Sequence, residues 1–200
     1  AAAHGALPVV AGEVKEFAAL ISGSAELRGV FASPAIAPDD KMKVLEAIVA
    51  RMYDPESAAF YDLSGKTERQ LRALTAASFV PLLLPEVSDR IAEEIVRRHL
   101  EAKDEFDCPY PIPSLAINDP AFNPGDSLAL WRGPTWPVMN WLLCRCLRRR
   151  GFQDHADRLY RSVIELIEKS GFREYYNPFT GEGHGARSFT WSALAVDMAS

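Results

Sequence analysis

One stretch of the chain, residues 171–191, places a carboxylate among aromatic side chains and turn-forming residues. It reads GFREYYNPFTGEGHGARSFTW, and Glu174 stands beside Tyr175 and Tyr176, two residues after Phe172. Aromatic neighbours withdraw a carboxyl group from water, a setting that suits general acid or base catalysis. An aromatic-flanked glutamate is also a common structural feature, so the stretch by itself leaves both interpretations open. We take Glu174 as the centre of a candidate pocket.

A second aromatic segment, residues 130–141, reads LWRGPTWPVMNW. Trp131 and Trp136 are separated by a Gly-Pro turn at Gly133, so both indoles could face a common space. Flat indole surfaces match the apolar C–H faces of sugar rings, and Arg132 could hold a carboxylate through its planar guanidinium. The alternatives are helix-entry packing for the tryptophans and an ordinary ion pair for the arginine. The segment predicts a sugar-binding wall.

Helical periodicity accounts for most of the remaining chain. Leu159, Val163 and Ile167, for example, recur every four residues and form one apolar face. No segment shows a strong strand pattern, and residues 57–66 predict only a short extended piece or a turn. We expect helices at about 10–21, 39–52, 68–84, 86–100, 134–149 and 154–169, and a last one that starts at about 188–192.

The long connection at residues 101–133 has no period, and its prolines prevent regular hydrogen-bonded ladders. Structureless loops longer than about 12 to 15 residues are uncommon in compact domains and are usually functional when they are not linkers. Apolar side chains such as Phe106 and Ile117 indicate a packed loop rather than a solvated linker. Helices joined by alternately short and long connections predict helical hairpins whose long loops gather at one end, where a pocket can form.

Taken together, these motifs resemble the C-terminal signature of glycoside hydrolase family 63. The resemblance consists of WRGPTWPVMNW, followed two helical patterns later by EYYNPFTGEGHG and FTW. Upstream, FYDLSGK, LRALTAASFVPLL and YPIPSLAINDPAF are similar to the compact mannosylglycerate and glucosylglycerate hydrolases of that family. The resemblance covers roughly residues 39–200.

The resemblance implies an all-α (α/α)6 barrel with the pocket at one end, and residues 1–200 are expected to form a single domain that is the C-terminal part of such a barrel. It also implies that Glu174 is the general base. The substrate-binding residues expected from the two motifs are Trp131, Arg132, Gly133, Trp136, Tyr175, Tyr176 and Trp191.

An inverting glycosidase needs a second carboxyl group about 6.5 to 9.5 Å from the base, so that a water molecule fits between the base and the sugar. The family's general acid is an aspartate upstream of any segment present here. Asp62, Asp119 and Asp126 lie in no matching motif. The isolated chain is therefore expected to be inactive, with its acid outside residues 1–200.

The leading hypothesis is an inverting hydrolase of an α-glucoside or α-mannoside, with glucosylglycerate and mannosylglycerate as candidate substrates. Their carboxylate could be bound by Arg132 or Arg187. One alternative is a trehalase-like or other (α/α)6 glucosidase. The other is a non-catalytic carbohydrate-binding or scaffold domain that kept the aromatic walls and lost the acid.

Composition excludes several other classes. A hydrophobic content of 48% over 200 residues can bury one sizeable core, and a formal charge of -5 argues against a nucleic-acid surface. The basic run at residues 145–150 fits a helix end, where cations are favoured. No apolar run approaches the roughly 20 residues that span a bilayer.

Cysteine and histidine usage bears on compartment and cofactors. Three cysteines at irregular spacing favour a reducing compartment, so we expect a cytoplasmic protein. The four histidines show no metal-ligand spacing, and neither a metal nor another cofactor is expected. The chain does not begin with Met, which suggests a start within a longer protein. The sequence favours no particular oligomeric state.

Overall fold

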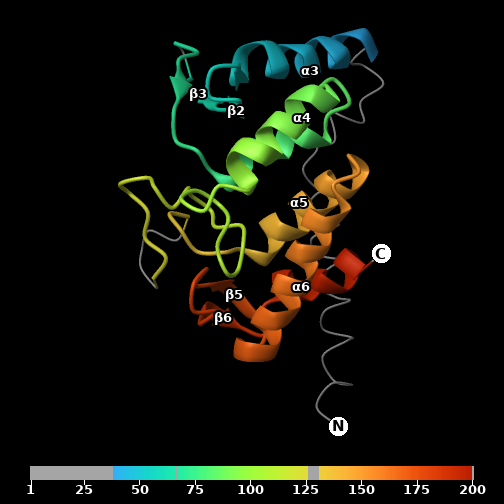
Figure 1. The fold of residues 1–200 in the computed structure, drawn as a ribbon. Helices are drawn as coiled ribbons and strands as arrows, with labels where there is room; N and C mark the ends of the chain where they lie inside the picture. The colour runs from blue at the N-terminus through green and yellow to red at the C-terminus, as the bar shows by residue number, and fades with distance from the viewer. Residues whose placement is uncertain (1–37, 66, 126–130, 200) are drawn as a thin grey trace. The chain divides into compact units, whose positions relative to one another are not determined.

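The computed structural model describes residues 38–65, 67–125 and 131–199 (Figure 1). The chain divides into two compact units, Ala1–Glu46 and Ala47–Ser200. Helix α3 (Pro38–Met52) contains the boundary between the two, and every other described element belongs to the second unit. The helix predicted at residues 10–21 and the carboxylate of Asp126 lie outside the described residues.

Four of the predicted helices are confirmed, because α3 matches the prediction at 39–52 and three more match in the second unit. α5 begins with Pro137, which needs no hydrogen-bond acceptor at the first helical position. It is followed by Gly151 at a φ of 81°, a backbone conformation that glycine adopts without strain. The confirmed helices of the second unit are α4 (Asp89–Ile95) with its π-helical continuation η2 (Val96–Leu100), α5 (Pro137–Arg149) and α6 (Gln153–Ser170).

Helix α5 is the centre of the hydrophobic core. It packs against α6, against the 3-10 helix η1 (Ala76–Leu83), and against the C-terminal 3-10 helix η3 (Leu194–Ala199). Figure 1 shows α5 and α6 side by side. Short α7 (Thr190–Ala193) continues directly into η3, so the chain is helical from residue 190 to residue 199, as predicted.

The helix predicted at residues 68–84 is wrong in its first half, whereas its second half is confirmed by η1. Strand β4 (Gln70–Leu71) pairs there with β3 (Asp62–Leu63), and helical structure begins only at Ala76. The residues between are extended because they pair with the long loop: the N–H of Ala76 donates to the Ser114 carbonyl (3.1 Å), and the N–H of Ala116 donates to the Leu74 carbonyl (3.0 Å). Tertiary pairing therefore overrides the apolar periodicity of this segment.

The absence of strands is also a wrong prediction, although the extended piece expected at 57–66 is confirmed. Three separate two-stranded antiparallel sheets are present. Besides β3 and β4, these are β1 (Tyr53–Asp54) with β2 (Ala59–Phe60), and β5 (Arg173–Tyr176) with β6 (Gly183–Arg187). Strands this short carry too few residues to show an alternating pattern.

The basic run at 145–150 lies at the end of α5, as predicted, and its arginines hold neighbouring segments to the helix. Arg150, with a side chain only 10% exposed, donates to the carbonyls of Leu82 (2.9 Å) and Val87 (2.5 Å). Arg145 pairs with Asp197 on η3 (2.8 Å). No helix among residues 38–65, 67–125 and 131–199 is long and apolar enough to cross a bilayer.

Candidate active site

The hairpin β5–β6 carries the predicted base and contains a bulge at its position. Arg173 pairs with Arg187 and Tyr175 with His184. Only Glu174 lies between these pairs on β5, whereas Gly185 and Ala186 both lie between them on β6. The extra residue makes a β-bulge opposite Glu174. Bulges of this kind often re-aim a side chain beside an active site.

The bulge holds the Glu174 carboxylate. The N–H of Ala186 donates to Glu174 Oε2 over 3.0 Å, and the side chain of Glu174 is half-buried. Gly185 has a φ of 64°, and a Cβ there would lie 2.6 Å from Glu174 Oε2 and 2.7 Å from a ring carbon of Tyr175. Only glycine fits at 185, because any side chain would displace the carboxylate or the ring.

Tyr176 is a structural residue of the hairpin. Its ring is fully buried, and its hydroxyl donates to the carbonyl of Gly171 (2.7 Å) while it accepts from the N–H of Arg173 (3.0 Å). Its main chain exchanges two hydrogen bonds with Thr135, of 2.8 and 2.9 Å. This bridge fixes the strand that bears Glu174 to the residue that precedes Trp136.

The tryptophans form one aromatic cluster with the hairpin. The Trp131 and Trp136 rings stack with centroids 3.9 Å apart and planes 4° from parallel. Trp136 also lies 4.8 Å from the Tyr175 ring and 5.9 Å from the Trp191 ring. Trp136 is only 2% exposed, whereas Trp131 is 49% exposed. Trp131 therefore presents the open aromatic surface, and Trp136 supports it from beneath.

Gly133 and Arg132 connect this cluster to the long loop. A Cβ on Gly133, at a φ of 151°, would lie 2.7 Å from the carbonyl carbon and oxygen of Asn123, so the close approach requires glycine. The Gly133 N–H donates to Ser114 Oγ (3.0 Å). The side chain of Arg132 is exposed, and it forms no ion pair with any residue that the structure describes. It is free to meet a ligand.

The two described aspartates considered as substitute acids have ordinary surroundings. Asp62 is exposed on β3, and Asp119 Oδ1 accepts the N–H of Ala121 (2.7 Å) in a local turn. Neither shares a hydrogen bond or an ion pair with Glu174 among the described residues. In the same part of the chain, no three His, Cys, Asp or Glu side chains come together as a metal site.

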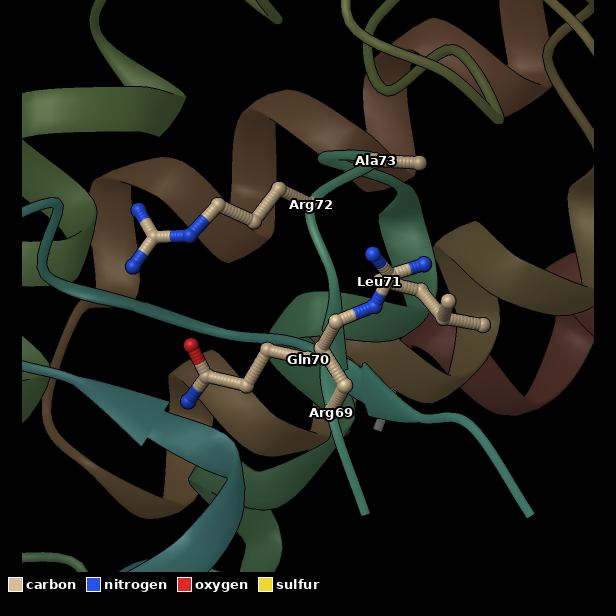
Figure 2. Close-up of a pocket in the computed structure, with 5 residues that line it drawn as sticks. All are labelled: Arg69, Gln70, Leu71, Arg72 and Ala73. Atoms are coloured by element: carbon tan, nitrogen blue, oxygen red, sulfur yellow. The ribbon is translucent and has the colours of Figure 1, made fainter. Parts of the chain in front are cut away.

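Two hollows on the described surface are large enough to hold a small ligand. The larger, about 780 Å³, follows the consecutive residues Arg69–Ala73 (Figure 2). Its lining includes two arginines and a glutamine but no carboxylate, so it lacks a group that could act as a base. The second, about 590 Å³, lies against the β5–β6 hairpin and is lined by Arg173, His184 and Arg187 among others.

Comparison with known proteins identifies the family. The sequence profile of the mannosylglycerate hydrolase MGH1-like glycoside hydrolase domain matches residues 18–192. The chain belongs to this family. The predicted resemblance to glycoside hydrolase family 63 is thereby confirmed.

Curated relatives of this chain are glycoside hydrolases. Mannosylglycerate hydrolase MGH1 of Selaginella moellendorffii is 35% identical over 71% of this chain and 28% of its own length. Mannosylglycerate hydrolase of Thermus thermophilus is 31% identical over 83% of this chain and 40% of its own. Glucosylglycerate hydrolase of Mycolicibacterium hassiacum is 33% identical over 74% and 33%. The chain thus spans between 28% and 40% of the length of these relatives.

The solved structures that this chain resembles are (α/α)6 barrel enzymes. The family 63 mannosylglycerate hydrolase of Thermus thermophilus, crystallised with glucose, superposes with a TM-score of 0.71 at 29% identity, over 80% of this chain and 39% of that one. Neutral trehalase of Saccharomyces cerevisiae superposes with a TM-score of 0.64 over 80% and 29%. Its identity of 18% makes that likeness one of fold alone.

Gly185 and Ala186 are site residues that sequence reasoning missed. The N–H of Ala186 belongs to the backbone, and backbone donors leave no mark in a pattern of side-chain types. The glycines at 181, 183 and 185 were the available signal. Regular spacing of that kind indicates a segment where backbone approaches backbone or a ligand.

Proposed function

We propose that the chain is the C-terminal part of the (α/α)6 catalytic barrel of an inverting glycoside hydrolase, with Glu174 as general base. The observation that carries the proposal is the bulge that fixes Glu174 on a strand tied to the stacked tryptophans. The Ala186 N–H contacts Oε2, and no described residue is hydrogen-bonded to Oε1. Oε1 is therefore the oxygen that can accept a proton from water.

In the proposed reaction, Glu174 takes one proton from a water molecule as the water oxygen attacks the anomeric carbon. The bond from that carbon to the leaving oxygen breaks, and a carboxylic acid on the opposite side of the sugar protonates this oxygen. We place that acid on an aspartate outside residues 1–200, since Asp62, Asp119 and Asp126 lie in no segment that matches the family's acid motif. Attack from the face opposite the leaving group inverts the anomeric configuration.

The proposed substrate is an α-glucoside or α-mannoside whose aglycone carries a carboxylate, such as glucosylglycerate or mannosylglycerate. The names of the relatives support this class, and so does the glucose bound to the Thermus enzyme. The exposed face of Trp131 offers a platform for the sugar ring. The guanidinium of Arg132, which forms no ion pair with any described residue, can donate two parallel hydrogen bonds to a carboxylate.

The three cysteines support a reducing compartment, and we propose the cytoplasm. Cys108, Cys144 and Cys146 are all unpaired and buried. Burial raises the pKa of the Cys108 and Cys146 thiols to about 12, so both remain protonated at neutral pH. A neutral, buried thiol acts as a small apolar side chain.

Substitution of the base tests the proposal. In the complete protein, Glu174→Gln keeps the side-chain shape and can still accept the Ala186 N–H, but it cannot take a proton. We expect kcat for hydrolysis to fall by about 10³-fold while sugar binding, followed by calorimetry, is retained. Glu168→Gln makes the same chemical change on the exposed surface of α6 and should leave kcat unchanged.

Four results bear on the mechanism and the substrate. Turnover by Glu174→Gln at the wild-type rate would remove Glu174 from its role. A first-formed product that retains the substrate's anomeric configuration, seen by proton NMR, would exclude direct attack by water. Sugar binding without any hydrolysis by the complete wild-type protein would instead favour a carbohydrate-binding domain, and preference for trehalose would favour a trehalase-like enzyme.

A further inference from the structure

Two arginines face each other across the β5–β6 hairpin. Arg173 and Arg187 are register partners, so their side chains leave the sheet at directly opposed positions. Like charges at such positions destabilise a hairpin. Among the residues that the structure describes, no carboxylate forms an ion pair with either arginine. The pair is an uncompensated concentration of positive charge.

This arginine pair lines the hollow of about 590 Å³ beside the hairpin. The two guanidinium groups of the lining carry hydrogen-bond donors only, whereas the Ser170 hydroxyl donates to the Gly181 carbonyl (2.8 Å). The lining carboxylate, Glu182, lies on an exposed turn. The polar residues of the lining are Ser170, Arg173, Glu182, His184, Arg187 and Ser188.

Two nitrogens in the same group are buried without a hydrogen-bond partner. They are Nε of Arg173 and Nε2 of His184. Buried polar groups are almost always paired in folded proteins, because removing one from water without a partner costs about 1 to 3 kcal/mol. Like-charge pairing and unpaired nitrogens both indicate that this part of the hairpin lacks an acceptor.

We propose that this face of the hairpin binds an oxyanion, a carboxylate or a phosphate group, through Arg173 and Arg187. The planar guanidinium matches the geometry of both groups and makes two parallel hydrogen bonds to either. An anion placed between the arginines removes their repulsion. His184 and the hydroxyl of Ser188 complete a polar rim.

The oxyanion site is distinct from the proposed base. Glu174 does not line the hollow, and neither does Ala186, whose N–H holds the Glu174 carboxylate. The site therefore does not rest on the hydrolase assignment. Its ligand can be a free phosphate or the carboxylate of a larger molecule, and the two sources require separate probes.

Calorimetric titration of the complete protein with inorganic phosphate and with D-glycerate, at constant ionic strength, tests the proposal. We expect at least one of the anions to bind the wild type, and Arg187→Gln to weaken that binding by about ten-fold or more, since a hydrogen bond to a charged group is lost. Arg187→Lys keeps the positive charge but not the planar guanidinium, so its affinity for the anion should lie between those of the wild type and Arg187→Gln. Arg187 is exposed, so an unchanged melting temperature will show that each variant is folded.

Arg149→Gln is the matched control. Arg149 is exposed on α5 and lies outside the hollow, so its substitution removes the same charge without touching the site. Equal weakening by Arg149→Gln and Arg187→Gln would reduce the effect to net charge and overturn the proposal. Absence of binding of both anions to the wild type would also overturn it.

The two probes separate the sources of the anion. Tighter binding of phosphate would identify a free phosphate site. Tighter binding of D-glycerate would identify a carboxylate site. A raised KM with an unchanged kcat in Arg187→Gln would then assign the substrate's carboxylate to this site in place of Arg132. Because Glu174→Gln should leave anion affinity unchanged, failure of the general-base proposal would not alter this result.

Discussion

The helical core around α5 and the β5–β6 hairpin are held together by different kinds of interaction. In the core, buried apolar side chains from several elements pack together, as Leu143 and Leu147 do, each 1% exposed. In the hairpin, the contacts that fix the strands involve the main chain. The N–H of Ala186 donates to Glu174, the Tyr176 hydroxyl donates to the Gly171 carbonyl, and the main chain of Tyr176 exchanges two hydrogen bonds with that of Thr135.

Because of this difference, we expect the stability of the fold and the position of the proposed base to depend on different residues. A core residue contributes through the volume it fills, and its neighbours can relax partly when it shrinks. The position of Glu174 depends instead on one backbone conformation and one hydrogen bond, which either form or do not. We therefore expect core substitutions to lower the free energy of unfolding, and hairpin substitutions to lower turnover.

The largest expected effect is on stability, from Leu147→Ala. Leu147 lies on α5 within the core, and loss of its buried methyl groups should reduce the free energy of unfolding by about 3 kcal/mol. Chemical denaturation of the complete protein measures this change, and kcat per folded molecule should remain at the wild-type value. Val196→Ala, at a position 82% exposed, should change stability by less than about 0.5 kcal/mol.

A fall in kcat of the folded Leu147→Ala protein would contradict the separation. It would mean that α5 packing also sets the geometry of the hairpin, which α5 approaches through α7.

The next largest effect is on turnover, from Gly185→Ala. The added Cβ would lie 2.6 Å from Glu174 Oε2, so the carboxylate must move, and kcat should fall by about 10²-fold. Steady-state kinetics with the proposed glycoside measures the change. Gly151→Ala is a matched control, because Gly151 also has a positive φ, 81°, but its Cβ would meet no atom within 4 Å.

Both glycine variants impose a similar backbone cost, which Gly151→Ala measures alone. Gly185→Ala should lose more stability through its contacts with Glu174 and Tyr175, and only Gly185→Ala should lose activity. Equal kcat values in the two variants would show that the bulge does not position Glu174.

The same contrast explains how much the sequence could predict. α6 was predicted within one residue at each end, because eighteen residues are enough to show a helical period. The first half of residues 68–84 was assigned wrongly because the pairing of Leu74 and Ala76 with the loop near Ser114 is a long-range contact. A contact between residues so far apart in the sequence leaves no pattern in the periodicity of the segment itself.

For the site, residue types indicated Glu174 and the tryptophans, and the family resemblance gave them expected roles. The sequence suggested that both indoles could face one space. In the structure Trp131 instead stacks on Trp136, which is buried, and residue types do not indicate which of the two is covered. The bulge was hidden for a different reason. It depends on the register between β5 and β6 and on the φ of Gly185, and neither follows from residue type alone.

The smallest expected effect comes from a turn that is built from polar contacts like the hairpin but has no part in the proposed chemistry. Between β1 and β2, Asp54 Oδ2 accepts from the hydroxyl of Ser57 (2.5 Å) and from its N–H (3.1 Å), and Arg72 lies 3.2 Å away. The Ser57 hydroxyl is the main cause that holds the pKa of Asp54 below its ordinary value of 3.8.

A carboxyl group whose pKa is lower in the folded state stabilises that state above its unfolded pKa, and this contribution is lost as the pH falls through the folded pKa. Ser57→Ala should therefore reduce the free energy of unfolding by about 1 kcal/mol at neutral pH, and by less once Asp54 is protonated. Urea unfolding of the wild type and the variant, at pH 7 and then at successively lower pH below 3.8, measures the difference, while kcat at pH 7 should be unchanged.

Ser88→Ala distinguishes this linkage from the loss of any serine hydrogen bond. The Ser88 hydroxyl caps α4 by accepting the N–H of Ile91 (3.3 Å), and removal of such a cap also costs about 1 kcal/mol. No carboxylate takes part in that contact, so the loss in Ser88→Ala should be the same at neutral and acid pH. A loss in Ser57→Ala that is equally independent of pH would show that the Asp54 carboxylate is not the partner through which Ser57 stabilises the turn. The turn would then be stabilised by packing, as the core is. Dependence on one specific hydrogen bond would in that case distinguish only the β5–β6 hairpin from the core.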